Sequence, residues 1–313
     1  MSLLTVTDLV KHFSSRQTVV RAVDGVSFRV GAGEAFGLVG ESGCGKSTAA
    51  RALLRLVEPD RGAIDFDGHD LRAARGAALI ALRRRMQIVF QDPYSSLNPA
   101  RTVGQTLAEP FRVHGIARGA EARARAAGLL EEVGLPAAAA ARYPHAFSGG
   151  QRQRIGIARA LALAPALIVA DEPVSALDVS VQAQILLLLR DLQARRGLAF
   201  VFVSHDLAVV RWFCRRVAVM YLGRIVEQGP VAEVFRHPRH PYTAMLRDAS
   251  PVPDPSRRGV LPRVVGEIPS AANPPAGCHF HPRCARVLPV CRTEYPVWAG
   301  SADAGFACHN PVS

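Results

Sequence analysis

Residues 40–48 read GESGCGKST and directly follow the apolar run EAFGLV. Gly40, Gly43 and Gly45 permit tight turns that point successive backbone N–H groups at an anion, and a helix beginning at Gly45 would add its positive end. The spacing matches G-x-x-x-x-G-K-[ST] between a predicted strand and the helical run TAARALLRLV. The stretch therefore predicts a phosphate-binding loop in an α/β fold.

The lysine of this loop is unusual because the chain has almost no other. Of 38 basic residues, 36 are arginine, and only Lys11 and Lys46 are lysine. Arginine's planar fork and lysine's compact ammonium are not interchangeable. Position 46 is therefore predicted to need a small point charge in a confined place, where it would reach the outer phosphates of a nucleotide while the Ser47 hydroxyl ligates Mg²⁺.

The composition of the 313 residues excludes several classes of protein. An apolar content of 49% excludes disorder as a description of the whole chain. The longest aliphatic run, ILLLL at residues 185–189, is far shorter than the ~20 residues of a membrane helix. The start, MSLLTVTDLVKHF, lacks the pattern of an export signal. We expect a cytosolic chain, unless another component holds it at a membrane.

The net charge of +12 raises the question of a nucleic-acid partner. The arginines are spread along the chain, and the longest basic run is RRR at residues 83–85. An arginine-rich codon usage is the favoured explanation, and a basic face toward anionic lipid head groups also fits. We expect no nucleic-acid partner.

The order of the predicted elements indicates a mostly parallel sheet that is covered on both faces. Residues 1–39 alternate in short runs typical of strands, broken at DG (24–25) and GAG (31–33). Strand-like AIDFD, MQIVF, ALIVA and AFVFVS then alternate with helical segments. Residues 102–143 form an Ala-rich helical lobe, and DASPVPDPSRRG, beyond Phe235, is a predicted linker.

A second motif is LIVADE at residues 167–172. An apolar strand that ends in Asp171 brings a carboxylate to the C-terminal edge of the sheet, where open α/β sheets bind ligands. Asp171 would hold Mg²⁺ opposite Ser47, directly or through water, and Glu172 would polarise an attacking water. Because Pro173 follows, the acidic pair could instead cap a helix, but the glycine loop favours the catalytic interpretation.

The third motif is FSGGQRQR at residues 147–154. Ser148, Gly149 and Gly150 precede a helix, which makes a second anion-binding helix start in one chain. A single nucleotide cannot easily use both starts, because each would claim the terminal phosphate. Two copies of the chain, or this chain and a paralogue, could therefore hold nucleotide between one chain's Lys46 loop and the other's Ser148 turn. Taken alone, SGG is only a flexible turn.

Together with Gln91 in VFQDP, SALD at residues 175–178 and His205 in VSHD, these motifs resemble the ATP-binding cassette ATPases over about residues 1–235. The resemblance implies ATP and Mg²⁺ as cofactors. It also implies a P-loop NTPase (RecA-like) α/β core with an antiparallel N-terminal part, an α-helical subdomain at about 96–150 and a cysteine-containing C-terminal extension at 236–313. A mild departure is Phe147, where the family usually has Leu.

The resemblance assigns a role to each matching position. Phe13 would stack on adenine, although it could equally be an ordinary core residue. Gln91 would sense Mg²⁺ and the water and couple to the membrane partner. Asp178 would contact the facing subunit beside Glu172, and His205 would contact the γ-phosphate. The predicted catalytic residues are Glu172, His205, Lys46 and Gln91, and the predicted Mg²⁺ ligands are Ser47, Gln91 and Asp171. The predicted nucleotide-binding residues are Phe13, Gly40, Glu41, Ser42, Gly43, Cys44, Gly45, Lys46, Ser47, Thr48, Gln91, Ser148, Gly149, Gly150, Gln151, Asp171 and Asp178.

The tail narrows the resemblance. QDPYSSLNP at 91–99, HPRHPYTAML at 237–246 and GCHFHPRC at 277–284 are similar to the ATPase subunits of bacterial oligopeptide and dipeptide importers. This similarity implies ATP-driven closure of a dimer, made with itself or with a paralogue, against two transmembrane permease subunits at the cytoplasmic face of the membrane. An extracytoplasmic solute-binding protein would act indirectly. Importers of nickel, opines or sugars are alternatives, and a soluble cassette ATPase acting on nucleic acid is a more distant one.

Four of the six cysteines lie in this tail: Cys278, Cys284, Cys291 and Cys308. Clustered cysteines in a cytosolic chain argue against disulfides, and paired C-x-x-C zinc spacing is absent. Four thiolates can hold a [4Fe–4S] cluster, which the resemblance implies. Zinc at the same sulfurs and free surface thiols are the alternatives. Cys214, beside Trp212, is predicted to be a core residue.

Overall fold

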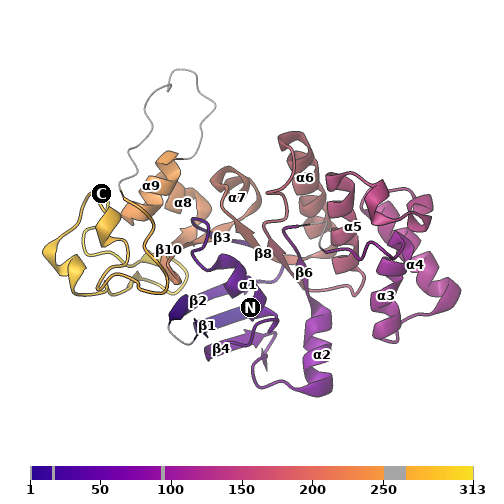
Figure 1. Ribbon diagram of the computed structural model, residues 1–313, viewed down its shortest axis with the longest axis horizontal. Coiled ribbons are helices and arrows are strands. Elements are labelled where there is room, and N and C mark those ends of the chain that lie inside the picture. The colour runs from indigo at the N-terminus through magenta and orange to yellow at the C-terminus, as the bar shows by residue number, and fades with distance from the viewer. Residues whose placement is uncertain (1, 16–17, 93–95, 250–265, 313) are drawn as a thin grey trace. The chain divides into compact units, whose positions relative to one another are not determined.

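The structure, a computed structural model, describes residues 2–15, 18–92, 96–249 and 266–312 (Figure 1). The chain forms two compact units: Met1–Ala74 with Phe202–Ser313, and Arg75–Val201. We call these the first and the second unit. The predicted linker DASPVPDPSRRG lies, apart from its first two residues, outside the described residues.

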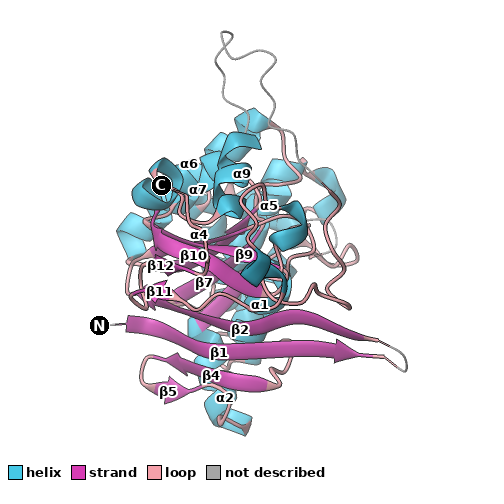
Figure 2. Cartoon of the chain, turned by 90° about the vertical axis from the view of Figure 1, so that its left-hand side faces the viewer, coloured by secondary structure: helices cyan, strands magenta, loops and turns pink. Residues whose placement is uncertain are grey.

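The N-terminal part of the first unit is an antiparallel sheet with strand order β2-β1-β4-β5 (Figure 2). Its strands are β1 (Ser2–Ser14), β2 (Val19–Gly31), β4 (Arg61–Phe66) and β5 (His69–Asp70). The predicted break at DG is wrong. β2 continues through it because Leu9 pairs with Val26 and Val10 with Asp24, which leaves Gly25, with φ +82°, as an extra residue. A bulge of this kind absorbs a turn-forming pair without ending the strand.

A second sheet passes through the first unit in the order β11-β12-β10-β9-β3. Strand β3 (Ala35–Val39) is predicted from its apolar run, and it pairs in parallel with β9 (Arg216–Tyr221), a strand that was not predicted. β10 (Arg224–Pro230) pairs antiparallel with β9 and with β12 (Gly305–Phe306), and β12 pairs with β11 (Ala299–Gly300). The tail therefore extends the sheet, which the sequence did not reveal. The helices are α1 (Lys46–Leu53), α7 (Leu207–Phe213), α8 (Val231–Arg236), α9 (Pro241–Ala249), η4 (His281–Arg283) and η5 (Pro289–Arg292).

Helix α1 begins as predicted but ends four residues before the end of the predicted run, which extends to Val57. Arg55 has φ +50°, in the left-handed region, so the chain leaves the helix after Leu54. Arg55 Nη1 donates to the carbonyls of Leu71 and Ala74 at 2.9 and 2.7 Å. These contacts hold the loop that follows the helix against its own unit.

The second unit contains the predicted helical lobe. Strand β6 (Met86–Val89) pairs in parallel with β7 (Leu167–Asp171), and β8 (Ala199–Ser204) spans the unit boundary. In the lobe, α3 (Val103–Val113), α4 (Gly119–Glu132) and α5 (Gly149–Leu161) pack on one another (Figure 1). The other elements are α2 (Gly76–Arg85), η1 (Ala137–Ala141), η2 (Pro144–Ala146) and α6 (Val179–Arg196). Within the described ranges, none of the helices combines the length and apolarity that crossing a bilayer requires.

Candidate functional site

The glycine loop lies between β3 and α1, in the context that the motif requires. All five residues of β3 are buried, and Gly45 occupies the N-cap of α1. Gly40 has φ +153° and Gly45 has φ +107°. A Cβ atom at Gly40 would lie 2.2 Å from the Met220 carbonyl oxygen, and one at Gly45 would lie 1.9 Å from that of Ala22. These two positions therefore require glycine for both the backbone angle and the close approach.

Lys46 is buried within this loop, with 4% of its surface exposed. Its Nζ donates to the carbonyl oxygens of Gly40 and Glu41 at 2.8 and 2.9 Å. The ammonium therefore sits inside the turn of the loop, as the confined point charge predicted from the sequence. Cys44, also buried, is within 3.8 Å of the same Nζ, and burial raises the pKa of its thiol.

Phe13 and His205 belong to the same unit. Phe13, near the end of β1, is 43% exposed, so it is not an ordinary core residue. The Lys11 Nζ lies 5.4 Å from its ring centroid. His205 is exposed at the end of β8, and Asp206 next to it caps α7 by accepting the N–H groups of Ala208 and Val209. Both side chains are accessible, as contacts to a ligand would require.

The second unit brings Gln91 and Glu172 together. The Gln91 Nε2 donates to Glu172 Oε2 at 3.0 Å. Asp171 ends the fully buried strand β7 and is 2% exposed, and Glu172 is 9% exposed. The helix-cap alternative for this acidic pair is wrong, because a turn follows Glu172 and the next helix has Asp178 at its N-cap.

Glu172 has φ +48°, a left-handed conformation that is uncommon for a residue with a side chain. Ser175 stabilises the turn by donating from its N–H and its hydroxyl to the Glu172 carbonyl at 3.3 and 3.1 Å. Strained backbone that the surroundings hold in place is frequent at functional sites. The turn fixes the direction of the carboxylate that the sequence assigns to the attacking water.

The SGG segment forms the start of α5. Ser148 is the N-cap, and its hydroxyl accepts the Gln151 N–H at 3.3 Å while Gln151 Oε1 accepts the Ser148 N–H at 3.0 Å. This reciprocal capping box is readable from S-x-x-Q. A Cβ atom at Gly150 would lie 2.4 Å from Val181 Cγ1, so glycine lets α6 approach α5. Ser148, Gln151 and Asp178 are exposed, whereas Phe147 is buried.

Two residues that were quoted only as part of the family resemblance contact the glycine loop. Arg283 Nη1 and Nη2 donate to the two carboxylate oxygens of Glu41 at 2.7 and 2.8 Å. The hydroxyl oxygen of Tyr242 accepts the Glu41 N–H at 2.8 Å. The only sequence signal for these contacts was an arginine and a tyrosine within Pro- and His-rich segments of the tail.

The four tail cysteines lie in the first unit. Cys291 is buried, and Cys278, Cys284 and Cys308 are partly exposed. Burial, the largest cause, and the other three thiols together raise the pKa of Cys278 to about 11. In the part of the chain that the structure describes, no three His, Cys, Asp or Glu side chains are placed to bind a metal ion. Neither the zinc nor the iron–sulfur expectation is confirmed. Cys214 is buried, as predicted for a core residue.

These features define a P-loop nucleotide site of the ATP-binding cassette class, and comparisons with known proteins agree. The model of the family described as "ABC transporter" matches residues 23–175. The model described as "Oligopeptide/dipeptide transporter, C-terminal region" matches residues 226–291. The two matches follow the cassette and its tail in the expected order.

Individual relatives match nearly the whole chain. A "Probable peptide ABC transporter ATP-binding protein" of Sinorhizobium fredii is 54% identical, with 98% of this chain and 90% of the relative covered. An "Oligopeptide transport ATP-binding protein" of Bacillus subtilis is 47% identical, with 98% and 97% covered. The solved dimeric, post-hydrolysis structure of the ATP-binding cassette MJ0796 bound to ADP and Pi is 30% identical, with a TM-score of 0.66 over 73% of this chain and 98% of that chain. The chain therefore belongs to the ABC transporter family, in the oligopeptide and dipeptide branch of its ATP-binding subunits.

Proposed function

We propose that this chain is the ATP-hydrolysing subunit of a bacterial importer for di- and oligopeptides. It works at the cytoplasmic face of the membrane, as a dimer with itself or a paralogue, against two transmembrane permease subunits. Membership of the peptide branch supports the substrate class. The observation that carries the proposal is the Gln91–Glu172 hydrogen bond, because it joins the hydrolytic carboxylate to the segment that leads into the helical lobe.

The residues of the site divide the reaction between them. Lys46 and the loop N–H groups would bind the outer phosphates, and Phe13 would stack on the adenine. Ser47, Gln91 and Asp171 would hold Mg²⁺, which would neutralise phosphate charge. Glu172 orients and polarises the attacking water, and His205 contacts the γ-phosphate. These residues and the loop residues Gly40, Glu41, Ser42, Gly43, Cys44, Gly45 and Thr48 make one half of a nucleotide site.

The other half comes from the facing subunit. Ser148 and Gly150 contact the γ-phosphate, Gly149 and Gln151 belong to the same nucleotide-binding turn, and Asp178 makes the contact between subunits beside Glu172. ATP can close the dimer only if it binds the closed state more tightly than the open one, and contacts from the exposed Ser148 turn supply that difference. Hydrolysis removes these contacts, and the dimer opens.

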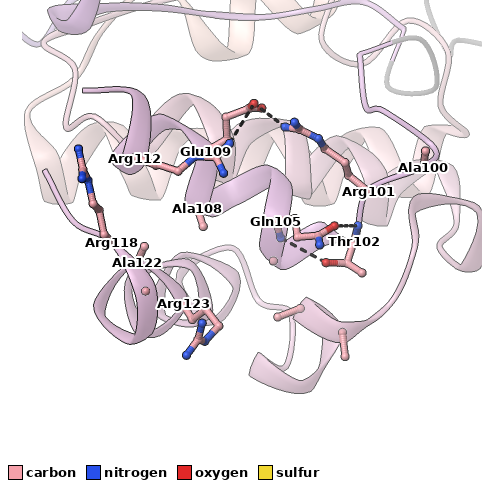
Figure 3. Close-up of a pocket in the computed structure, with 14 residues that line it drawn as sticks. Ala100, Arg101, Thr102, Gln105, Ala108, Glu109, Arg112, Arg118, Ala122 and Arg123 are labelled. Carbon is pink, nitrogen blue, oxygen red and sulfur yellow. Dashed lines mark hydrogen bonds and ion pairs between the residues drawn. The ribbon is translucent and has the colours of Figure 1, made fainter. Parts of the chain in front are cut away.

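The helical lobe carries a pocket suited to the permease. It has a volume of about 800 Å³ and is lined by α3, α4, η1 and the residues before α3. Four arginines, Arg101, Arg112, Arg118 and Arg123, line it with a single acidic residue, Glu109. Figure 3 shows Arg101 and Arg112 directed at Glu109, whereas Arg118 lies just before α4 and Arg123 extends from it. This charge favours an acidic segment, and we assign the pocket to a cytoplasmic segment of a permease subunit.

Charge reversal in this pocket tests the proposal. When the wild-type chain is purified from solubilised membranes, two membrane subunits and a second ATPase subunit should co-purify with it. Arg118→Glu should lower recovery of the membrane subunits about tenfold or more, because an acidic segment would then face a like charge. ATP hydrolysis by the isolated chain should stay at the wild-type rate, since Arg118 lies on the surface of the lobe. The measurement is quantitative mass spectrometry of the purified complex.

Arg125→Glu is the matched control. Arg125 is an exposed arginine on α4, the helix that follows Arg118; it is bound to Glu121 at 2.8 Å and does not line the pocket. This variant should recover the complex as the wild type does. Equal loss with both variants would refute the pocket assignment. A salt-sensitive complex with nucleic acid would instead favour the soluble ATPase, and transport of nickel, opines or sugars by the recovered complex would replace the peptide assignment.

We also assign a [4Fe–4S] cluster to Cys278, Cys284, Cys291 and Cys308. Each iron of such a cluster takes one thiolate, so the four sulfurs need not converge on one point as they must around zinc. The Cys278 N–H donates to the Cys291 carbonyl oxygen at 2.9 Å, which supports the proximity of these two residues. The backbone N–H of Arg286 also donates to Cys284 Sγ at 3.4 Å, a contact that suits a thiolate. The cluster would link the segments of the tail to one another.

Anaerobic purification tests the cluster. We expect about four iron and four sulfide per chain, with a broad absorption band near roughly 400 nm. Cys291→Ser should remove most of this iron, and Cys214→Ser should leave it unchanged because Cys214 lies outside the tail. Stoichiometric zinc without iron, or neither metal, would overturn the assignment.

A further inference from the structure

The C-terminal extension forms hydrogen bonds with one residue of the phosphate-binding loop, Glu41. Arg283 makes a two-pronged ion pair with the Glu41 carboxylate, and Tyr242 accepts the Glu41 N–H. The Arg283 side chain is 2% exposed and Tyr242 is completely buried. Both residues follow Phe235, so the tail is built into the wall of the loop.

An aromatic cluster holds these two side chains in place. The rings of Tyr221, Tyr242 and Phe280 lie with centroids 4.6 to 5.4 Å apart. The Arg283 guanidinium lies 5.9 Å from the centroids of both Tyr221 and Phe280. Burial raises the pKa of Tyr242 well above its ordinary value, so the hydroxyl stays neutral and its oxygen can accept the N–H. The two contacts therefore have little freedom to move.

Lys46 and the tail hold different atoms of Glu41. Lys46 donates to the Glu41 carbonyl oxygen, whereas Tyr242 and Arg283 bind its N–H and its carboxylate. When Lys46 turns to the phosphates of ATP, it gives up its bond to the carbonyl. The tail contacts do not compete with the nucleotide, and they can keep Glu41 in place throughout.

Such an anchor matters because the loop is rich in glycine. Gly40, Gly43 and Gly45 all have positive φ, and glycine loses more conformational freedom on ordering than other residues. A loop that is already ordered before the ligand arrives loses less freedom on binding, which raises affinity. A buried arginine–carboxylate pair with two parallel hydrogen bonds also fixes direction as well as distance.

We propose that Arg283 and Tyr242 are positioning residues for nucleotide binding, through which the C-terminal extension holds the phosphate-binding loop in its binding conformation. The proposal rests on the proposed ATP binding and adds the tail to the nucleotide site. Neither residue needs to touch the nucleotide, because both act through Glu41.

Nucleotide binding to the full chain tests this role. Arg283→Gln is expected to raise the Kd for ATP, measured by calorimetry with Mg²⁺ at 10 °C, about tenfold, which corresponds to about 1.3 kcal/mol at that temperature. The Kd of Arg283→Lys should lie between those of the wild type and Arg283→Gln, since lysine keeps the positive charge but cannot make the two parallel hydrogen bonds of arginine. Glu41→Gln should weaken binding as Arg283→Gln does. The variant that carries both Arg283→Gln and Glu41→Gln should have a Kd no higher than that of the single variant that binds more weakly, because both substitutions remove the same contact.

Two further variants separate positioning from folding. Tyr242→Phe removes only the hydroxyl and should raise the Kd severalfold with little change in Tm. Asp303→Asn breaks the tail's ion pairs with Arg216 (2.9 Å) and Arg29 (3.0 Å), away from the loop, and should leave the Kd unchanged. If Arg283→Gln does not fold, Tyr242→Phe still decides the matter.

The outcomes distinguish the two proposals. A wild-type chain that does not bind ATP would refute the proposed function itself. Wild-type binding with unchanged Kd in folded Arg283→Gln and Tyr242→Phe would refute the positioning role alone. A raised Kd in Asp303→Asn as well would show a general effect of loosening the tail, and would also refute the specific role of Glu41.

Discussion

Replacing Glu172 by glutamine (Glu172→Gln) is expected to slow ATP hydrolysis roughly 100- to 10,000-fold and to leave ATP binding intact. An amide has nearly the shape of the carboxylate and can still accept the hydrogen bond from Gln91, which is 3.0 Å long in the wild type. It cannot polarise water or take its proton. The Lys46 loop does not include Glu172, so nucleotide affinity has no reason to fall.

Because Glu172→Gln binds ATP without hydrolysing it, the dimer of this variant should stay closed. With saturating ATP and Mg²⁺, Glu172→Gln should elute as a closed dimer, alone or with its paralogue, whereas the wild type returns to monomer as ATP is consumed. Phosphate release measures the rate of ATP hydrolysis, and light scattering measures the mass of the dimer. Glu131→Gln, at an exposed glutamate of α4, is the matched control and should behave as the wild type. Wild-type turnover in Glu172→Gln would refute the assignment of this carboxylate.

The parts of the fold that were predicted correctly are those whose signal is local. The run AFGLV and the loop after it contain the local signals for the strand, the turn and the helix start, so β3, Gly45 and the start of α1 agree with the prediction. The strand LIVAD is likewise recognisable from its own five buried residues. The parallel pair β6–β7 joins two of the predicted apolar runs, whereas β9, the parallel neighbour of β3, was not predicted.

The errors arise where tertiary contacts override a local signal. Asp24-Gly25 looks like a turn, but pairing with β1 on either side keeps β2 continuous. The two-residue strands β11 and β12 are too short to show any periodicity, and only pairing makes them strands, β12 with β10 and β11 with β12. No pattern within the tail could have predicted that it extends the sheet.

In the candidate site, too, local features were predicted and long-range contacts were not. Lys46 and Ser148 carry out their local roles, loop charge and helix cap, within a few residues of their own positions. The Arg283–Glu41 pair joins residues 242 positions apart and has no local pattern. The left-handed conformation of Glu172 was also hidden, because a positive φ at a non-glycine residue depends on the turn built around it.

Lys46→Arg is expected to lower kcat/KM for ATP at least about 100-fold, the loss typical of removing one preorganised donor. The change keeps the charge and uses the residue that this chain has in 36 of its 38 basic positions. Lys46 is 4% exposed, and its ammonium fits between two carbonyl oxygens less than 3 Å away. A guanidinium is planar and wider, so it must either push the loop aside or point out of it. In both cases the positive charge moves away from the position where the phosphates bind.

Lys11→Arg is the matched control, because it makes the same replacement at the only other lysine. Lys11 binds Asp60 at 2.8 Å, and that carboxylate is 41% exposed, so a longer fork has room and the surface pair contributes little to stability. Steady-state ATP hydrolysis should therefore be near wild type for Lys11→Arg and nearly absent for Lys46→Arg, with both variants folded. If both variants hydrolyse ATP at the wild-type rate, charge alone suffices at position 46, and the confinement of the loop is not why this chain keeps a lysine there.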